Sequence, residues 1–168
     1  MNPPQSEQLI LNCANESQTD QLGACIAQSI TDGMVIELNG QLGAGKTRLV
    51  RAICCSLDID TDKVNSPTFV LLQLYTDGRI PVAHFDTYRL GDIDEFLAIG
   101  ADEFTHSHDW LCLIEWAERV EACLPADRLQ INISANNTDA RRFEISSFGP
   151  SSASLLRRIR DNASRFRG

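Results

Sequence analysis

Residues 40–47 form a short segment whose residue types and spacing suit the binding of a polyphosphate. They read GQLGAGKT and match the pattern G-x-x-x-x-G-K-[ST] at every defined position. A loop that wraps a phosphate must aim successive backbone N–H groups inward and keep side chains away, and glycine permits both. Lys46 would reach the β- and γ-phosphates of a nucleotide, and the hydroxyl of Thr47 would bind Mg²⁺. The predicted nucleotide-binding residues are Gln41, Leu42, Gly43, Ala44, Gly45, Lys46 and Thr47.

The elements expected around this loop are those that a phosphate site needs. An apolar run over Met34–Leu38 predicts a strand that leads into the loop, and apolar residues at helical spacing predict a helix over Lys46–Leu57. The start of such a helix presents unpaired N–H groups and the positive end of its dipole to an anion. Because strand, loop and helix agree, a glycine-rich turn that matches by chance is the weaker interpretation.

Two carboxylates end apolar runs further along the chain and are candidates to act with a magnesium ion. The run 82–86 ends in Asp86, although His84 interrupts it, and the more purely apolar run 111–115 ends in Glu115. In P-loop proteins an acidic residue holds the metal and a further polar group orients the attacking water. The candidate catalytic residues are Lys46, Asp86 and Glu115, and the candidate metal ligands are Thr47, Asp86 and Glu115. Which carboxylate contacts the ion stays open, as does the alternative that either one only caps a turn.

Two further features could lie close to this chemistry. The segment Asn65–Phe69 carries Ser66 and Thr68 after the helix expected from the loop, where P-loop proteins place segments that respond to the nucleotide. An ordinary helix-to-strand turn is the alternative. Trp116 directly follows the second carboxylate and is either a core aromatic residue or a lid over the site.

The rest of the chain alternates between strand-like and helix-like patterns. Strands are predicted over Leu9–Ala14, Val70–Tyr75, Ile80–Phe85, Leu111–Trp116, Leu129–Ala135 and Arg142–Phe148, the second and third as a hairpin and the last two as another. Helices are predicted over Asp20–Ile30 (capped by Ser17 or Thr19), Asp94–Ile99, Ala117–Leu124 and from Ser151 onward. This alternation predicts a layered α/β fold with antiparallel additions near the C-terminus.

Length and charge limit the possible classes of protein. The 168 residues are expected to form one domain, 1–168. A net charge of −8 disfavours indiscriminate binding to nucleic acid or to an anionic membrane. The segment 151–168 departs from this balance, with five arginines and one aspartate, and is expected to form a basic helix packed on the domain or extending from it.

Features that would indicate a membrane, secreted or metal-stabilised protein are not found in the sequence. No apolar run approaches the roughly 18 residues that cross a bilayer, and the first residues do not resemble a secretory signal. The six cysteines form no Cys-x-x-Cys pair, so we expect free thiols in a reducing cytoplasm and no structural metal. His106 and His108 form a His-x-His pair, for which an exposed loop is favoured over a metal site.

Four blocks in this order carry a resemblance to a known family: residues 40–47, 66–69 (SPTF), 84–90 (HFDTYRL) and 114–116 (IEW). Together they resemble the TsaE (YjeE) family, the small ATPase subunit of bacterial tRNA threonylcarbamoyladenosine synthesis, over roughly residues 9–150. The resemblance implies a P-loop NTPase-like three-layer fold with a mostly parallel sheet, and binding and hydrolysis of ATP with Mg²⁺. It also implies partner protein subunits that attach the threonylcarbamoyl group to the adenosine beside the anticodon. The chain would then contact tRNA only indirectly, through these partners.

The resemblance further implies a role for each matched residue. It assigns phosphate and magnesium binding to Lys46 and Thr47, a switch-like loop to Ser66 and Thr68, metal and catalytic roles to Asp86 and Glu115, and the active-site rim to Trp116. The neighbourhood of Glu16 and Ser17 would hold the adenine. The chain departs from the family at Gln41, where an acid is usual, and at Arg48, where Thr or Ser is usual. Neither position supplies an obligatory group of the loop, so we expect altered affinity and not loss of binding.

Three functions remain open at this level. The leading hypothesis is an ATPase, slow when alone, whose nucleotide state controls a partner complex. The alternatives are a small-molecule or nucleotide kinase, for which Arg79 and Arg89 are the few arginines able to cover the phosphates, and an assembly module that binds ATP with little hydrolysis. A GTPase is disfavoured because neither lysine, Lys46 nor Lys63, lies in an Asn-Lys-x-Asp motif.

Overall fold

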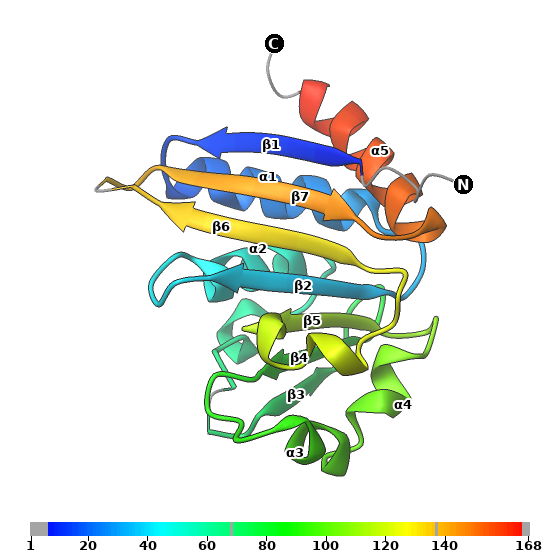
Figure 1. Ribbon diagram of the computed structural model, residues 1–168. Helices are drawn as coiled ribbons and strands as arrows, with labels where there is room; N and C mark the ends of the chain where they lie inside the picture. Colours follow the sequence, from blue (N-terminus) through cyan, green and yellow to red (C-terminus); the bar gives the residue numbers. More distant parts are fainter. Residues whose placement is uncertain (1–6, 68, 137, 166–168) are drawn as a thin grey trace.

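The computed structural model describes residues 7–67, 69–136 and 138–165. Its central element is one seven-stranded sheet with the strand order β1-β7-β6-β2-β5-β4-β3 (Figure 1). The strands are β1 (Gln8–Cys13), β2 (Val35–Gly40), β3 (Leu72–Tyr75), β4 (Val82–Asp86), β5 (Leu111–Glu115), β6 (Leu129–Ala135) and β7 (Arg141–Ser147). β6, β2, β5 and β4 run parallel to one another. Antiparallel strands flank this parallel core on both sides, β7 and β1 beside β6 and β3 beside β4. This arrangement confirms the predicted α/β fold with a parallel core and antiparallel additions.

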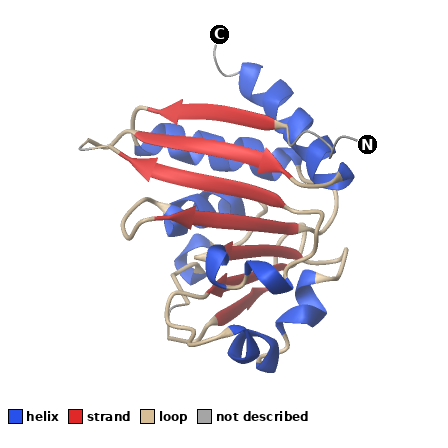
Figure 2. Cartoon of the chain, in the orientation of Figure 1, coloured by secondary structure: helices blue, strands red, loops and turns tan. Residues whose placement is uncertain are grey.

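Helices cover both faces of the sheet and complete three layers (Figure 2). One face carries α1 (Glu16–Ser29), α2 (Lys46–Ser56) and α5 (Pro150–Arg165), and the other carries α3 (Ile93–Ala98), α4 (Ala101–Thr105) and the 3₁₀ turns η2 (Ala117–Arg119) and η3 (Glu121–Cys123). A further 3₁₀ turn, η1 (Thr61–Lys63), follows α2. Among the described helices, none has the length and apolar character to cross a bilayer.

Strand β5 shows how the sheet divides the core, because every one of its residues is buried. Leu111 and Leu113 belong to the apolar cluster beneath α1 and α2, whereas Cys112 and Ile114 belong to the cluster on the opposite face. Side chains of a strand alternate between the two faces, so Glu115 continues the row of Leu111 and Leu113. The predicted central strand therefore ends in a carboxylate that faces α2.

The start of α1 differs from the prediction. The helix begins at Glu16, earlier than expected, and its cap is Asn15, whose side chain accepts a hydrogen bond from the N–H of Gln18 at 3.0 Å. Ser17 and Thr19, the predicted caps, lie inside the helix. Asn15 has the extended backbone of a capping residue and already satisfies a free N–H group of the first turn, which places the boundary ahead of both.

Two segments between the elements also differ from the prediction. The helix predicted over Ala117–Leu124 is replaced by η2 and η3, because Val120 between them has φ −124° and buries its side chain fully in the second apolar cluster. Burial of Val120 thus outweighs continuation of the helix. After Gly100 the chain forms α4, which was not predicted because five residues are too few to show a helical period.

The basic helix expected near the C-terminus is α5, which packs against the layer of α1 over its described length. Leu156 and Ile159 are fully buried, and the guanidinium of Arg158 donates to the carbonyl of Ser29 at 2.7 Å. Glu7, directly before β1, contacts the same helix, because it pairs with Arg157 at 3.4 Å and with Arg160 at 3.5 Å. Part of the basic surface of α5 is therefore used inside the molecule.

Helices α1 and α2 approach each other at a glycine. A Cβ built at Gly23 would lie 2.3 Å from the Cβ of Ala52 and 3.0 Å from its carbonyl carbon. No side chain fits in that space, so glycine lets α1 support α2 directly behind the loop that precedes it.

We predict that Gly23→Ala lowers the free energy of unfolding by about 1–3 kcal/mol, because the added methyl group forces two packed helices apart. Urea denaturation measures this change. Gly91→Ala is the matched control, since the atom nearest to its Cβ would be the end of the flexible Glu95 side chain at 3.2 Å. Equal stability of the two variants would contradict the close contact.

Candidate functional site

The loop between β2 and α2 leaves the first N–H groups of α2 available to a ligand. Gly45 precedes the helix with φ 108°, a conformation that favours glycine, and no described side chain caps this end. By contrast, Asn15 and Asp92 accept hydrogen bonds from the first turns of α1 and α3. Unpaired N–H groups and the helix dipole together make the start of α2 suited to an anion.

Lys46, the first residue of α2, is buried at the mouth of this loop. Its ammonium donates to the carbonyl oxygens of Gly40 at 2.6 Å and Gln41 at 2.9 Å, and it lies 3.9 Å from the centre of the Trp116 ring. Burial lowers the pKa of Lys46, and nearby carboxylates, Glu115 foremost, oppose that shift. The loop thus holds a positive charge between backbone oxygens and an aromatic face.

Thr47 lies next to a carboxylate that was predicted to share its chemistry. Its hydroxyl donates to Oε1 of Glu115 at 2.6 Å. Glu115 is opposite Leu38 in the pairing of β2 with β5, so both elements end at the same edge of the sheet. In parallel α/β sheets ligands bind outside the carboxyl ends of the strands, which is where this pair lies.

Asp86 is opposite Glu115 in the pairing of β4 with β5 and reaches the same edge. Its Oδ2 accepts a hydrogen bond from the Ser66 hydroxyl at 2.5 Å, and its Oδ1 accepts one from the N–H of Tyr88 at 2.9 Å. The loop that contains Ser66 is therefore joined to one carboxylate, and the predicted P-loop, residues 40–47, is joined to the other. Thr68, predicted for the same switch-like loop, lies outside the described residues.

Trp116 is half-buried and borders the site. It has φ 60°, and its backbone N–H donates to the carbonyl of Leu38 at 2.9 Å. The centre of its ring lies 4.8 Å from that of the Tyr88 ring. The hydroxyl of Thr87 donates to the carbonyl of Trp116 at 2.6 Å and so supports this turn. The indole is thus held beside the ammonium of Lys46, and its role at the rim of an active site stays a prediction.

Two residues at this site were not selected from the sequence. His84 places Nε2 2.6 Å from Oε2 of Glu115, and the guanidinium Nε of Arg141 donates to the carbonyl of Ala44 at 2.9 Å. The sequence did contain a signal for His84, because a residue two positions before Asp86 in a strand lies on the same face of the sheet as Asp86. Arg141 had none, because 97 residues separate it from Ala44.

The residues predicted near the adenine lie at the start of α1. Glu16 pairs with Arg48 of α2 at 3.0 Å, and Asp20 pairs with the same guanidinium at 2.8 Å, whereas Ser17 is exposed on the same turn. A cavity of about 530 Å³ lies between the start of α2 and the switch-like loop, lined by residues that include Asp20, Thr47, Arg48 and Ser66. The adenine contacts of Glu16 and Ser17 stay a prediction.

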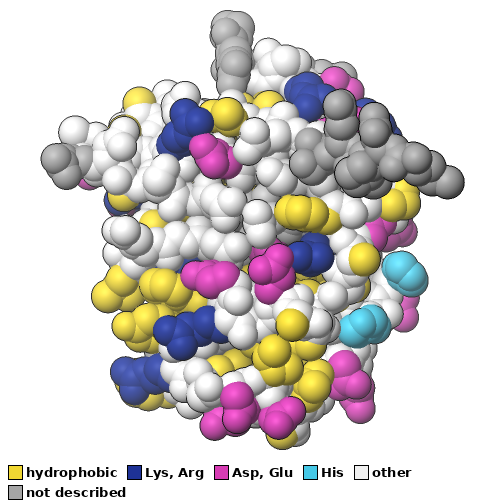
Figure 3. All heavy atoms as spheres, viewed as in Figure 1, with side chains coloured by type: hydrophobic (Ala, Val, Ile, Leu, Met, Phe, Trp, Pro, Cys, Tyr) yellow, Lys and Arg dark blue, Asp and Glu magenta, His cyan; other side chains and the backbone are white. Residues whose placement is uncertain are grey.

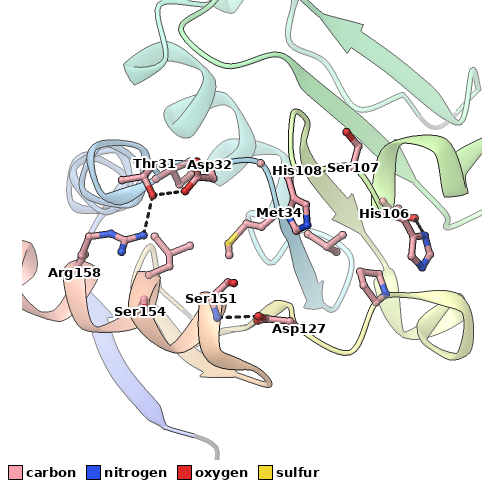
Figure 4. A pocket seen from close by; sticks show the side chains of 16 residues that line it. Thr31, Asp32, Met34, His106, Ser107, His108, Asp127, Ser151, Ser154 and Arg158 are labelled. Atoms are coloured by element: carbon pink, nitrogen blue, oxygen red, sulfur yellow. Dashed lines mark hydrogen bonds between the residues drawn. The ribbon is translucent and has the colours of Figure 1, made fainter.

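A larger cavity, of about 640 Å³, lies at the opposite edge of the sheet, where β2, β5 and β6 begin (Figure 4). Its polar side chains are largely bound within the chain: Asp127 accepts from the N–H groups of Ser151 and Ser152, and Arg158 donates to backbone and to Thr31. His106 and His108 border it, yet the described residues include no group of three or more His, Cys, Asp or Glu able to hold a metal ion. We therefore place the candidate site at the P-loop, despite the smaller cavity there.

Large apolar side chains are exposed beside the P-loop. Leu42 at the tip of the loop is 78% exposed, and Phe69 and Val70 after the switch-like loop are 84% and 70% exposed. Arg89 lies over the Phe69 ring at 4.5 Å. Figure 3 shows hydrophobic and basic side chains together at the side of the molecule where β2 ends. Such apolar surface is typical of a protein-binding face.

Comparison with known proteins gives a consistent family. Residues 13–143 match the family model described as "Threonylcarbamoyl adenosine biosynthesis protein TsaE". The tRNA threonylcarbamoyladenosine biosynthesis protein TsaE of Bacillus subtilis is 38% identical over 143 residues, covering 85% of this chain and 88% of its own length. The TsaE protein of Treponema pallidum is 36% identical over 125 residues, covering 73% and 90%. The crystal structure of YdiB from Bacillus subtilis superposes with a TM-score of 0.77 at 29% identity, covering 97% of this chain and 98% of that one.

The bond from Arg141 to Ala44 predicts a measurable stiffening of the P-loop. Arg141→Met keeps the apolar stem and removes the donor, so we expect the amides of residues 41–46 to exchange with solvent deuterium about tenfold faster, the effect of losing roughly one hydrogen bond. Arg142→Met is the control, because the half-exposed Arg142 pairs with Glu144 on the surface at 2.8 Å. Unchanged exchange in Arg141→Met would show that this bond does not restrain the loop.

Proposed function

The chain belongs to the TsaE family and so takes part in tRNA threonylcarbamoyladenosine biosynthesis, and within that role we propose that it is a Mg²⁺-dependent ATPase. The observation that carries the proposal is the bond between Thr47 and Glu115 at the uncapped start of α2. A hydroxyl, a carboxylate and free N–H groups meet there, beside the ammonium of Lys46. That combination matches what a nucleoside triphosphate with a hard cation requires.

The residues present fit both the nucleotide and the ion. A Cβ built at Gly45 would find no atom closer than Nε of Arg141 at 3.9 Å, so the space over the loop is open to a phosphate. The oxygens of Thr47, Glu115 and Asp86 are the donors that Mg²⁺ prefers. When bound, the ion would neutralise charge on the β- and γ-phosphate oxygens.

The other steps belong to the protein's own groups. Lys46 would exchange the carbonyls of Gly40 and Gln41 for phosphate oxygens, and the loop amides would bind the remaining charge. The contact with Thr47 supports Glu115 as the carboxylate nearer to the ion. Asp86, joined to Ser66, would orient the attacking water or report the state of the γ-phosphate to the switch-like loop. Positioning and electrostatics would supply the rate enhancement.

We propose that partner proteins of the threonylcarbamoyl transfer complex act on this same edge of the sheet, and that tRNA is reached through them. The exposed Leu42, Phe69 and Val70 support a protein-binding face next to the nucleotide. A site that a partner completes would hydrolyse ATP slowly when the chain is alone. A role in tRNA threonylcarbamoyladenosine biosynthesis also supports the expected cytoplasmic location.

A kinase receives less support from the positions of the two candidate arginines. The guanidinium of Arg79 donates to the carbonyls of Ala27 and Ile30 at the end of α1, and that of Arg89 lies over the Phe69 ring. Product analysis separates the remaining functions. An ATPase releases free phosphate, a kinase yields a phosphorylated acceptor in step with ADP, and an assembly module binds its partners in a nucleotide-dependent way with little phosphate release.

We predict that Trp116 reports nucleotide binding, because its ring contacts the ammonium that would move to the phosphates. Trp110→Phe leaves Trp116 as the single tryptophan of a chain that has two. Titration of this variant with ATP or ADP in magnesium buffer should give a saturable change in fluorescence. Lys46→Met should weaken binding tenfold or more and abolish phosphate release, since it removes a charged contact to the phosphates.

The second of the two lysines provides the matched control. Lys63 pairs with Asp77 on the surface at 3.0 Å, so Lys63→Met should leave affinity and phosphate release unchanged. Equal affinity of Lys46→Met and the parent protein, or no fluorescence change with adenine nucleotides, would contradict the proposed function.

A further inference from the structure

His84 is a fully buried histidine that lies between the catalytic edge of the sheet and the core. Its side chain is 0% exposed, its Nε2 lies 2.6 Å from Oε2 of Glu115, and its Nδ1 lies 3.4 Å from the hydroxyl of Tyr75. Three neighbouring strands, β3, β4 and β5, each contribute one of these side chains. Tyr75, His84 and Glu115 thus form a polar row, which continues from Glu115 to the hydroxyl of Thr47.

Alternation along the strands explains how this row arises. In β4, Val82 belongs to the cluster beneath α2, so His84 and Asp86 face the same layer. Tyr75 of β3 pairs with Val82 and belongs to the same cluster, as does Leu113 in the row of Glu115. One polar row thus crosses the apolar layer directly under the start of α2. An unpaired polar group there would be costly, so each member needs its neighbour.

The positions of the protons follow from the neighbours. An ionised carboxylate can only accept, so the 2.6 Å contact between Nε2 of His84 and Oε2 of Glu115 calls for a proton on Nε2, and the hydroxyl of Tyr75 is then placed to donate to Nδ1. An imidazole that accepts at Nδ1 carries its proton on Nε2. That N–H then donates to Oε2 of Glu115, while Oε1 of the same carboxylate accepts from Thr47. Each oxygen of Glu115 therefore has one donor, and the carboxylate cannot rotate without losing both.

We propose that His84 is a positioning residue, which holds the carboxylate of Glu115 so that one oxygen stays with the Thr47 hydroxyl, at the place where a magnesium ion would bind. The inference rests on the proposed function for the role of Glu115, and it adds the residue that orients this carboxylate. It also gives Tyr75 a part, as the group that selects the tautomer of His84.

A direct test observes the proton without any nucleotide. The chain contains three histidines, so the ring nitrogens of His84 can be assigned in ¹⁵N-correlated spectra, with the exposed His106 and His108 as internal references. We expect a ring that carries a proton on Nε2, and we expect this solvent-protected proton to shift in Glu115→Gln. A ring protonated at Nδ1, or resonances that ignore Glu115→Gln, would overturn the proposal.

A second test separates positioning from simple filling of the core. His84→Gln can place an amide N–H near the position of Nε2, whereas the shorter His84→Asn cannot. We expect His84→Asn to need about tenfold more Mg²⁺ for half-maximal nucleotide binding and to lower kcat by a similar factor, with nucleotide affinity in EDTA unchanged. His84→Gln should lie within about threefold of the parent protein in both quantities.

The control is His108→Asn, at the edge of the sheet far from the P-loop, which should behave as the parent protein. Equal losses in His84→Gln and His84→Asn, or losses that appear equally in EDTA, would mean that His84 only supports the fold and would overturn the proposal. Failure of the parent protein to bind any nucleotide would instead refute the proposed function, and the tautomer measurement would still decide the role of His84.

Discussion

The hydrogen bond from Thr47 to Glu115 joins the two parts of the site, and much of the fold serves to keep it in place. Thr47 lies in the first turn of α2 and Glu115 ends β5, 68 residues later. The bond requires β5 to lie beside β2 in parallel register, with Leu38 opposite Glu115, and α2 to cover the face toward which Glu115 points. A slip of one residue in β5 would turn this carboxylate to the opposite face. Gly23 contributes from behind, because it lets α1 support α2 closely.

The described residues include two buried clusters of charged groups, and these clusters differ in how their polar atoms are satisfied. Glu37 of β2 is fully buried, and its oxygens accept from Arg128 and, at 2.7 Å, from Gln130. Arg128 also pairs with Glu121 at 3.0 Å, so that cluster is satisfied within the chain and is expected to contribute to structure only. In the cluster at the P-loop, Lys46 donates to backbone carbonyls and not to a carboxylate. No described side chain caps the start of α2 there. A ligand can replace those contacts, which is why the chemistry is proposed there.

The two edges of the sheet are specialised in different ways. At the amino ends of the parallel strands the larger cavity is bordered by groups that already bind one another, with Asp127 capping α5. At the carboxyl ends, two carboxylates, a lysine and an aromatic rim meet beside exposed apolar residues such as Leu42 and Phe69. Under the proposed function, a nucleotide and a protein-binding surface that lie close together could alter one another. The carboxyl ends of the strands would provide this proximity.

Local features could be predicted from the sequence because they depend on contiguous residues. The loop 40–47, the strand before it and the helix after it form one continuous signal, and apolar runs or period-two alternation predicted most strands to within a few residues. The cap at Asn15 and the break at Val120 were missed, since the first depends on competition between adjacent capping groups and the second on burial in a distant cluster.

By itself, the sequence predicted a phosphate-binding loop and the residues that form it, and it indicated that Asp86 and Glu115 end apolar runs. Only the tertiary structure decided that Glu115 meets Thr47, that His84 holds the far oxygen of Glu115, and that Arg141 reaches Ala44. These contacts join residues 31 to 97 positions apart. They depend on strand order and register, which arise from packing of the whole core and not from any local pattern of residues.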